Sequence, residues 1–518
     1  MRALDLAIIV VFLVGMPLLG IWIAGRQRSG SDYFVGEGKI SWWVACLSVV
    51  SAETSTLTVL SVPTVAYLGA FTYLQLAIGY VIGRIVVSFV LLPRYVAGNM
   101  TTAYNFLGKR FGGGMQGTAS VTFLFTRLLA DGVRLFATAI PIKIVLAAYG
   151  VNAAYWQIVA VLGIAMVVYT FFGGVRAVVW VDAIQMLWYV LGGVAVIVVL
   201  ADRLPTGWLG AAVDAGKTQL LDFASAPLSN NYAFVTAVLG GAVLSMASHG
   251  ADQLIVQRLM ACNDLRASQK ALMASGVVVF LQFGLFLLIG TMLWSFYKGL
   301  DPVKDLGLAT NDELFASFIV NELPSGLSGF VIAGILAAAL SSSLGALASS
   351  TVTDVYQRFV RRPLTEAESL KQGRIWTVVW AGALIVFASM FTTTKNPIVE
   401  TALAITGYTY GALLGAFLLG LLVRKARQAD AIVAFLSTVA VMAFVILGLK
   451  FSKKTGEFLG VDFAKAAGDS VALAFPWYTP LGVAVTLVVG GLLALRHRGS
   501  TVPAALDDPD DTAVPATK

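Results

Sequence analysis

The sequence predicts an all-α, polytopic membrane protein with about 13 transmembrane helices. The first observation is composition: 58% of the 518 residues are hydrophobic, 12% are charged, and the mean hydropathy is +0.84. Soluble domains are about 45–50% apolar and about 25% charged. The second observation is that the apolar residues fall in runs of about 20, the length that crosses a bilayer. This pattern excludes a soluble enzyme and a disordered chain.

The predicted membrane spans follow from these apolar runs, because a helix of about 20 residues crosses about 30 Å of hydrocarbon. In chain order they are 4–24, 41–69, 71–96, 118–149, 154–172, 178–201, 233–258, 271–298, 328–357, 374–393, 397–422, 430–449 and 476–496.

The loop charges predict the orientation of these spans. An odd number of spans places the two termini on opposite sides. With the N-terminus outside, the cytoplasmic loops hold about twice as many Lys and Arg as the outside loops, as the positive-inside rule requires. We therefore expect an integral protein of the cell (inner) membrane with a cytoplasmic C-terminus.

The loops leave little room for any function outside the membrane. The longest, 202–232 and 299–327, are too short for a soluble domain. No HExxH motif or paired catalytic carboxylates occur on one helix, so we expect a transporter and no enzyme. A channel would need a repeated filter motif, and a receptor would need a fused output domain. We expect the lipid bilayer as a partner, no nucleic acid and no obligatory protein partner.

The second span carries an unusual cluster of hydroxyl side chains around Glu53, with Pro63 following. The cluster comprises Ser48, Ser51, Thr54, Ser55, Thr56 and Thr58. Such side chains can satisfy freed backbone groups, so the helix can unwind at membrane depth. Unwound carbonyls would supply the oxygens that a dehydrated Na⁺ needs. The alternative is a continuous helix whose serines bond back to its own carbonyls.

Two further spans are interrupted by polar residues. The ninth holds hydroxyls at Ser341, Ser342, Ser343, Ser349, Ser350 and Thr351. Neutral oxygens favour a weakly held Na⁺, whereas Ca²⁺ would want more carboxylates. The seventh span holds Ser248, His249, Gly250, Asp252 and Gln253, and is a second candidate broken helix. His249 there acts as a hydrogen-bonding spacer or as a proton relay.

Ionisable residues at membrane depth are costly and therefore mark functional sites by default. They are Glu53, Arg84, Arg127, Asp131, Arg134, Lys143, Asp182, His249, Asp252 and Asp354. The alternative is that some lie at the interface or form structural ion pairs. Asp131 and Arg134, at i and i+3, can neutralise each other.

The two interrupted spans suggest an internal repeat. The second and seventh spans lie five apart, as expected for inverted five-helix repeats. The predicted divisions are a first helix and inside loop at 1–40, a repeat at 41–201, an outside loop at 202–232, a repeat at 233–422, two accessory helices at 423–497 and a disordered cytoplasmic tail at 498–518.

Four segments give the chain a family resemblance. They are WWVACLSVVSAETSTLTVLSVPTVAYLG (42–69), GGVRAVVWVDAIQ (173–185), HGADQLIVQR (249–258) and SSSLGALASSTVTD (341–354). Over about residues 1–500 the chain resembles the solute:sodium symporter family, which includes proline, sialic-acid and sodium/glucose transporters. The resemblance implies a leucine-transporter-like core of 5+5 inverted repeats and Na⁺-coupled uptake by alternating access.

The resemblance also implies where Na⁺ binds. The main sodium site takes backbone carbonyls at Ser51 and Thr54. Asp182 matches a residue of a second sodium site in some members. If the ninth span is placed by its small-residue face, Ala339, Ser342 and Ser343 complete the main site. If it is placed by Asp354 instead, Ala338 and Ala339 replace the main-site hydroxyls, and Ser341 and Ser342 form the second site with Asp182. The two placements differ by about one turn. Na⁺ is the coupling ion, and we expect no other cofactor or metal.

The implied solute site lies between the unwound segments. A fork-shaped guanidinium at Arg134 would grip a carboxylate, as in sialic-acid members. Further candidate substrate-binding residues are Glu53, Ser55, Thr56, Thr58, Gln75, Ser248 and Gln253. We therefore predict a sodium-coupled symporter for a small polar organic solute, such as a carboxylate, an amino acid or a sugar derivative. The alternative is a proton-coupled carrier on the same fold that uses Glu53 or Asp182.

Overall fold

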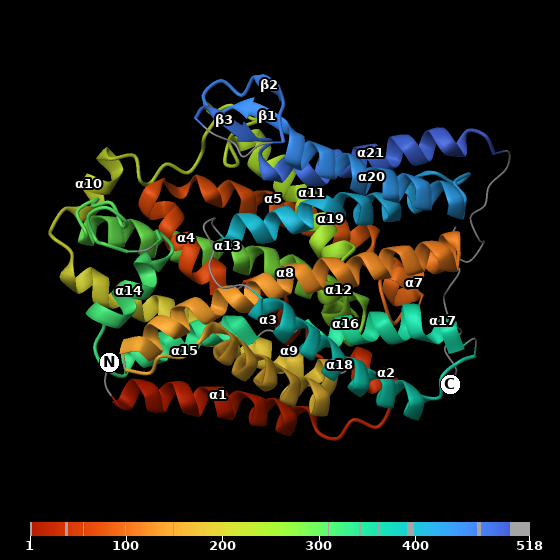
Figure 1. Cartoon of the computed structure of the whole chain (residues 1–518), viewed down its shortest axis with the longest axis horizontal. Helices are drawn as coiled ribbons and strands as arrows, with labels where there is room; N and C mark the ends of the chain where they lie inside the picture. Colours follow the sequence, from red (N-terminus) through yellow and green to blue (C-terminus); the bar gives the residue numbers. More distant parts are fainter. Residues whose placement is uncertain are drawn as a thin grey trace.

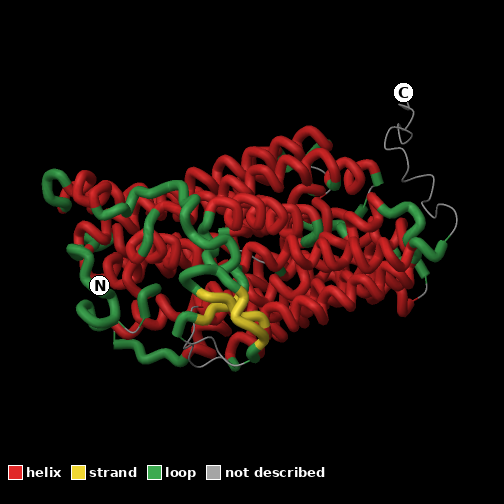
Figure 2. The backbone as a smooth tube through the Cα atoms, turned by 90° about the horizontal axis from the view of Figure 1, so that it is seen from above, coloured by secondary structure: helices red, strands yellow, loops and turns green. Residues whose placement is uncertain are grey.

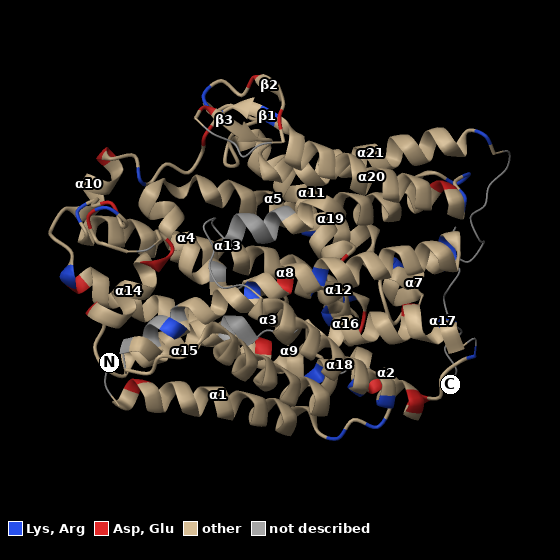
Figure 3. Ribbon diagram, viewed as in Figure 1, with Lys and Arg blue, Asp and Glu red and all other residues tan. Residues whose placement is uncertain are grey.

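The structure is a computed structural model in which long helices run side by side (Figure 1). It describes residues 3–36, 40–54, 56–98, 100–148, 150–308, 310–340, 343–360, 362–390, 398–463 and 468–497. The short elements α10 and α14 lie at one end of the long axis, and α7 and α17 lie at the other. Charged residues are frequent toward these two ends, and several also lie on the helices between them (Figure 3).

The regular elements of the first half of the chain are helices. In order it forms α1 (Ala3–Ala24), α2 (Gly30–Val35), α3 (Trp42–Glu53), α4 (Thr56–Leu68), the 3-10 turn η2 (Phe71–Tyr73), α5 (Leu74–Val90), α6 (Leu92–Ala97), α7 (Tyr104–Phe111), α8 (Gly113–Ala148), α9 (Tyr155–Arg203) and α10 (Trp208–Asp214).

The second half adds helices and one small sheet. In order it forms the π-helical η3 (Thr236–Gly240), α11 (Gly241–Gly250), α12 (Gln253–Met260), α13 (Leu265–Phe296), α14 (Glu313–Glu322), α15 (Leu327–Leu340), α16 (Leu344–Ser350), the π-helical η4 (Thr351–Tyr356), α17 (Gln357–Val360), α18 (Glu366–Ser389), α19 (Ile398–Leu422), α20 (Gln428–Gly448), strands β1 (Leu449–Ser452), β2 (Phe458–Val461) and β3 (Ser470–Ala472), η5 (Phe475–Trp477) and α21 (Tyr478–Ala494).

Several of these helices have the length and apolarity of membrane spans. Within the described residues seven helices pass that test, or eight if a bent pair is one span. The outer helix α1 exposes Val11, Leu18 and Trp22, as a lipid-facing helix does. The finding supports a membrane protein, and the count of 13 stays a prediction.

Helix α9 covers two of the predicted spans. A straight helix of its 49 residues would measure roughly 74 Å, more than twice the hydrocarbon thickness of about 30 Å. Gly174 divides it, because its backbone is non-helical with φ 56° and ψ −155°. A Cβ at this position would come within 2.6 Å of the Tyr33 carbonyl oxygen, so glycine is required on both counts.

The predicted break in the second span is confirmed. Helix α3 ends at Glu53, and Thr54 adopts an extended backbone with φ −80° and ψ 101°. The helical segments on either side are bent by 64°. The alternative of a continuous helix is therefore wrong.

The predicted break in the seventh span is also confirmed. Helix α11 ends at Gly250, and Asp252 has an extended backbone with φ −98° and ψ 121°. The Asp252 side chain then caps α12 by accepting a hydrogen bond from the Leu254 amide at 2.9 Å. The capping aspartate was a readable signal for a new helix start.

The small sheet between α20 and α21 departs from the all-α expectation. Its strands pair antiparallel in the order β2-β1-β3, and they lie together on one flank of the bundle (Figure 2). The sequence predicts only a loop here, between spans 430–449 and 476–496. Gly456, with φ 75°, marks the turn between β1 and β2 and was the overlooked signal.

Candidate functional site

The break between α3 and α4 brings together buried oxygen atoms. Ser51 and Thr54 are both fully buried. Their carbonyls belong to the helix end, which leaves the last carbonyls outside the helical hydrogen-bond ladder. The Ser51 hydroxyl has no hydrogen-bond partner among the described residues, and the Tyr189 side chain of α9 lies close to Ser51 and Thr54. Such an arrangement can ligate a small hard cation.

The other residues expected at this site lie where α15 ends and α16 begins. Ser343 is buried directly before α16, and Ala339 lies within α15. Ser341 and Ser342 lie outside the described residues, so the structure does not decide between the two placements of this segment. The Thr56 hydroxyl donates to the Ile335 carbonyl at 3.1 Å, which brings α4 against α15.

Asp182 lies on α9 and is fully buried. The Ser48 hydroxyl donates to its Oδ2 at 3.0 Å. Arg258 of α12 donates to the same oxygen from Nη2 at 2.8 Å and from Nε at 3.2 Å. Arg258 is not among the ionisable residues expected at membrane depth, because it is the last residue of the predicted span 233–258. A sodium ion at the second implied site would share Asp182 with this guanidinium.

Glu53 forms a second buried ionic cluster at the same break. Its Oε2 pairs with Arg84 of α5, and His249 of α11 places Nε2 at 3.7 Å. Arg84 also donates from Nη1 to the Ser275 hydroxyl of α13 at 2.7 Å. The Glu53 side chain is 18% exposed, whereas Arg84 is 0% exposed. Glu53 is therefore the partly accessible member of a pair whose other member is fully buried.

Aromatic rings surround this cluster on the side of η2 and α5. The Tyr73 ring lies 5.2 Å from Phe283 and 5.5 Å from Tyr232 between centroids, and Tyr80 lies 6.5 Å from Phe283. Tyr73 and Tyr80 are within electrostatic reach of Glu53. The sequence does not predict this cluster, because its rings come from segments far apart in the chain.

A third ionic cluster corrects the predicted pairing on α8. Asp131 pairs with Arg127, one turn earlier at 3.3 Å, and not with Arg134. Arg127 also pairs with Asp252, and the Tyr410 hydroxyl of α19 donates to Asp252 at 2.7 Å. Arg127 lies between the carboxylates of Asp131 and Asp252 and pairs with both of them. In the described part of the chain, no carboxylate forms an ion pair with Arg134.

Some of the remaining candidate substrate residues lie near the helix breaks, whereas others bind backbone groups elsewhere. Thr58 is half-buried on α4, and the Ser248 hydroxyl lies 2.8 Å from His249 Nδ1, next to the Glu53 cluster. Ser55 lies outside the described residues. Gln75 instead donates to the Tyr232 carbonyl at 2.8 Å and accepts from the Asp222 amide at 3.1 Å.

Gln253 is likewise engaged with backbone groups. Its Oε1 accepts from the Ala103 amide at 2.8 Å, and its Nε2 donates to the Thr101 carbonyl at 3.2 Å. The amides of Gln75 and Gln253 therefore fasten loops and helix ends.

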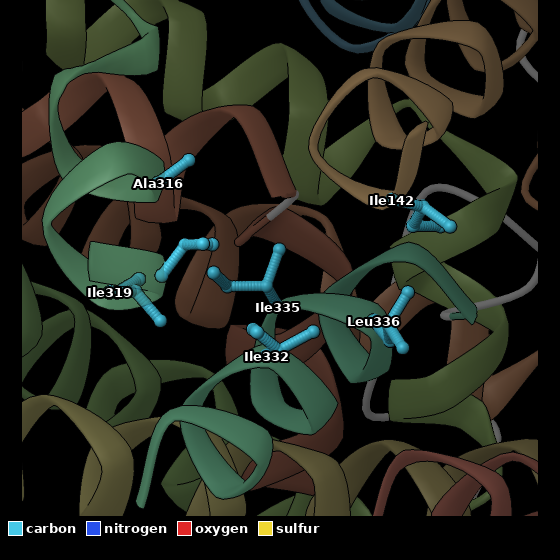
Figure 4. Close-up of a pocket in the computed structure, with 7 residues that line it drawn as sticks. Ile142, Ala316, Ile319, Ile332, Ile335 and Leu336 are labelled. Atoms are coloured by element: carbon cyan, nitrogen blue, oxygen red, sulfur yellow. The ribbon is translucent and has the colours of Figure 1, made fainter. Parts of the chain in front are cut away.

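The pocket in Figure 4 has a different character from these polar clusters. It lies between α8, α14 and α15, and Ile142, Ile319 and Ile335 are among its lining residues. Its volume is only ≈ 10 Å³, and every lining side chain is a hydrocarbon. A polar solute would find no hydrogen-bond partner among these side chains, so the candidate site is the polar region at the helix breaks.

Comparison with known proteins gives consistent results. The family model described as "Sodium:solute symporter family" matches residues 33–437. The sodium/sialic acid symporter NanT of Aliivibrio fischeri is 25% identical over 508 residues, which cover 96% of this chain and 94% of that protein. The human sodium-coupled monocarboxylate transporter 1 is 24% identical, covering 96% of this chain and 87% of that protein. The human sodium/iodide cotransporter is 26% identical, covering 90% and 74%.

Solved structures show the same fold. A substrate-bound, outward-open Na⁺-coupled sialic acid symporter matches with a TM-score of 0.80 at 22% identity, covering 96% of this chain and 99% of that chain. The transporter Mhp1 in a closed conformation matches with a TM-score of 0.53 at 13% identity, covering 94% and 99%. The predicted leucine-transporter-like fold is confirmed by these likenesses.

Proposed function

This chain belongs to the sodium:solute symporter family, and from that premise we propose that it imports a hydroxylated organic carboxylate together with Na⁺. The observation that carries the proposal is the pair of interrupted helices, α3/α4 and α11/α12, with buried polar side chains at both breaks. Transporters of this architecture place ion and solute at such breaks.

The main sodium site is formed by the carbonyls of Ser51, Thr54 and Ala339 and by the hydroxyls of Ser342 and Ser343. Support comes from the helix end at Glu53, from the buried Ser51 and from the buried Ser343 before α16. Na⁺ is held here by neutral oxygens, so it can also leave when the site opens.

The second sodium site uses Asp182 with Ser341 and Ser342. The ion pair between Asp182 and Arg258 weakens this site, because the guanidinium already neutralises the carboxylate. The second site is therefore the one with lower Na⁺ affinity.

The carboxylate of the solute binds Arg134. Two observations support this role: the guanidinium is half-buried at membrane depth, and Asp131 is held by Arg127 and leaves Arg134 available. Arg134 also lies one turn before Thr138, whose hydroxyl is 3.2 Å from that of Thr56 just past the break. A planar guanidinium can bind both oxygens of a carboxylate.

The hydroxyl groups of the solute bind at Glu53 and His249. Arg84 neutralises Glu53, so the cluster attracts hydrogen-bond donors more than a second full positive charge. His249 Nε2 has no hydrogen-bond partner among the described residues and faces Glu53. The half-buried rings of Tyr73 and Tyr80 offer apolar faces to the carbon skeleton.

Transport follows from linkage between the ion and the solute. Na⁺ bound between α3/α4 and α15/α16 favours the state that is open to the outside and completes the solute site. Neither ligand shifts the equilibrium unless it binds the two states unequally. The membrane potential contributes about 2.3 kcal/mol for each charge per 100 mV.

The chain sits in the cell (inner) membrane with its N-terminus outside and its C-terminus in the cytoplasm. Its two inverted repeats span 41–201 and 233–422. The asymmetry of Lys and Arg between the loops supports this orientation, and the five-span separation of the two broken helices supports the repeats.

Two measurements test the proposal. A thermal-shift screen of purified protein against organic acids, sugars and amino acids, each in Na⁺ and in K⁺, should give the largest stabilisation for a hydroxylated carboxylate in Na⁺. Proteoliposomes should then accumulate that solute with an inward Na⁺ gradient and not when choline replaces Na⁺. Accumulation in choline driven by a pH gradient would instead indicate the proton-coupled carrier.

A further inference from the structure

A basic groove lies beside the start of α18, and none of the residues that line it is proposed above to bind Na⁺ or the solute. It has a volume of ≈ 560 Å³ and is lined by Arg28, Phe171, Ala367, Leu370, Lys371, Arg374, Ile375, Val378 and Val379. These residues come from the loop after α1, from α9 just before its kink at Gly174, and from α18. In Figure 3, Lys and Arg segments surround α2, the start of α18 and the loop after α1.

The three cations of the groove have no ion-pair partner within the described part of the chain. Arg28 and Lys371 are exposed, and Arg374 lies over the Phe171 ring at 5.6 Å. The Nε of Arg374 is buried without a hydrogen-bond acceptor among the described residues. The positive charge of the groove is therefore not neutralised by these residues, and it favours the binding of an anion.

The nearby acidic residues are engaged elsewhere. Glu366 accepts a hydrogen bond from the Ser31 amide at 3.0 Å. Glu368 pairs with Arg362 at 2.6 Å and closes the capping box of α18 with Thr365. Neither carboxylate lines the groove.

The second half of the groove is apolar and faces outward. Ile375, Val378 and Val379 on α18 are 43%, 48% and 47% exposed. They follow the cations along a helix that spans 24 residues, so the surface changes from basic to hydrocarbon within two turns. A ligand that fits must carry an anionic group at one end and a hydrocarbon chain at the other.

We infer that this groove binds one anionic phospholipid, with the phosphate on Arg28, Lys371 and Arg374 and an acyl chain along Ile375, Val378 and Val379. Clusters of cations at the cytoplasmic ends of spans attract anionic lipid headgroups. The assignment to the cytoplasmic leaflet rests on the orientation given under the proposed function. The basic and apolar character of the groove is independent of that orientation.

The test measures lipid retention on the full chain, so it does not depend on transport. Protein is placed in nanodiscs of phosphatidylcholine with one-fifth phosphatidylglycerol, re-extracted in detergent, and its bound lipid is counted by native mass spectrometry. The groove variant R28Q/K371Q is compared with R266Q/K270Q, which removes the same charge from exposed positions on α13. The single variant R374Q removes the cation over Phe171.

The wild type and R266Q/K270Q should retain phosphatidylglycerol in preference to phosphatidylcholine. Each groove cation removed should lower that preference roughly fivefold, so R28Q/K371Q should lose most of it. Equal retention by all variants would overturn the proposal. Displacement of the lipid by millimolar inorganic phosphate would also overturn it, because a free anion would then suffice. A protein that retains the lipid but fails to transport leaves this site intact and refutes only the proposed function.

Discussion

Arg258 Nη2 lies 2.8 Å from Asp182 Oδ2, and this buried contact ties α12 to α9. The Ser48 hydroxyl joins both side chains and adds α3. Two further polar residues of the same short helix are also used: Gln257 donates to the Phe34 carbonyl at 2.7 Å, and Gln253 binds the start of α7. Helix α12 is thus fastened to helices on several sides.

Breaking one partner of the Arg258 pair should therefore be costly. Arg258→Gln leaves Asp182 as an uncompensated buried charge, which costs about 3–5 kcal/mol. We expect a clearly lower melting temperature in detergent, measured by the intrinsic fluorescence of the protein.

The double variant Asp182→Asn with Arg258→Gln serves as its control. Removing both charges should recover much of the lost stability, since no lone charge remains. The loss of stability is also measured for Asp182→Asn alone. If the losses of the two single variants simply add in the double variant, the two side chains are not coupled and the interpretation is wrong.

Glu53→Gln should change solute selectivity. Removing a charged acceptor of a hydroxyl group weakens binding by about 1.5–3 kcal/mol, which is roughly tenfold to 150-fold in KM. Uptake assays in proteoliposomes compare a hydroxylated carboxylate with its deoxy analogue of the same length.

The deoxy analogue is the internal control for Glu53→Gln. Its KM should stay nearly unchanged, because it has no hydroxyl to lose. An equal rise in KM for both compounds would show that Glu53 acts only through its ion pair with Arg84.

Arg134→Lys should weaken every carboxylate solute, hydroxylated or not. Lysine keeps the charge but loses the planar fork, so about a tenfold rise in KM is expected. Arg203→Lys, in the exposed pair with Glu322, is a matched control with no expected effect. Unchanged uptake in Arg134→Lys together with a best solute that is neutral would refute the carboxylate site.

Ser342→Ala should raise the Na⁺ concentration that gives half-maximal uptake, by roughly fivefold to tenfold for a lost neutral ligand. Ser51→Ala provides the contrast. Because only the backbone carbonyl of Ser51 is proposed as a ligand, Na⁺ dependence should be the same as in the wild type. A shift with Ser51→Ala and none with Ser342→Ala would reverse the assignment of ligands.

The helix breaks were predictable because their signal is local. Hydroxyls around Glu53 and the Gly250–Asp252 segment stand out in apolar runs, and both positions are breaks in the structure. The fold followed from the same features together with the family resemblance.

The partners of the buried charges were not predictable from spacing. Residues three or four apart lie on the same face of a helix. Spacing alone therefore allows Asp131 to pair with either Arg127 or Arg134. The choice depends on Asp252, which lies more than 100 residues away and contacts Arg127. Arg258 and Asp182 are likewise joined only by tertiary packing.

Gly174 divides α9 without a single loop residue between the two halves. Reporter-fusion and protease-accessibility mapping need a flexible, solvent-exposed segment between consecutive crossings. An insertion at residue 174 would meet the Tyr33 backbone and the hydrogen-bonded helix on either side. Such experiments would count two crossings as one and invert the assigned sidedness of everything downstream, so labelling of single engineered cysteines is the safer route to the topology.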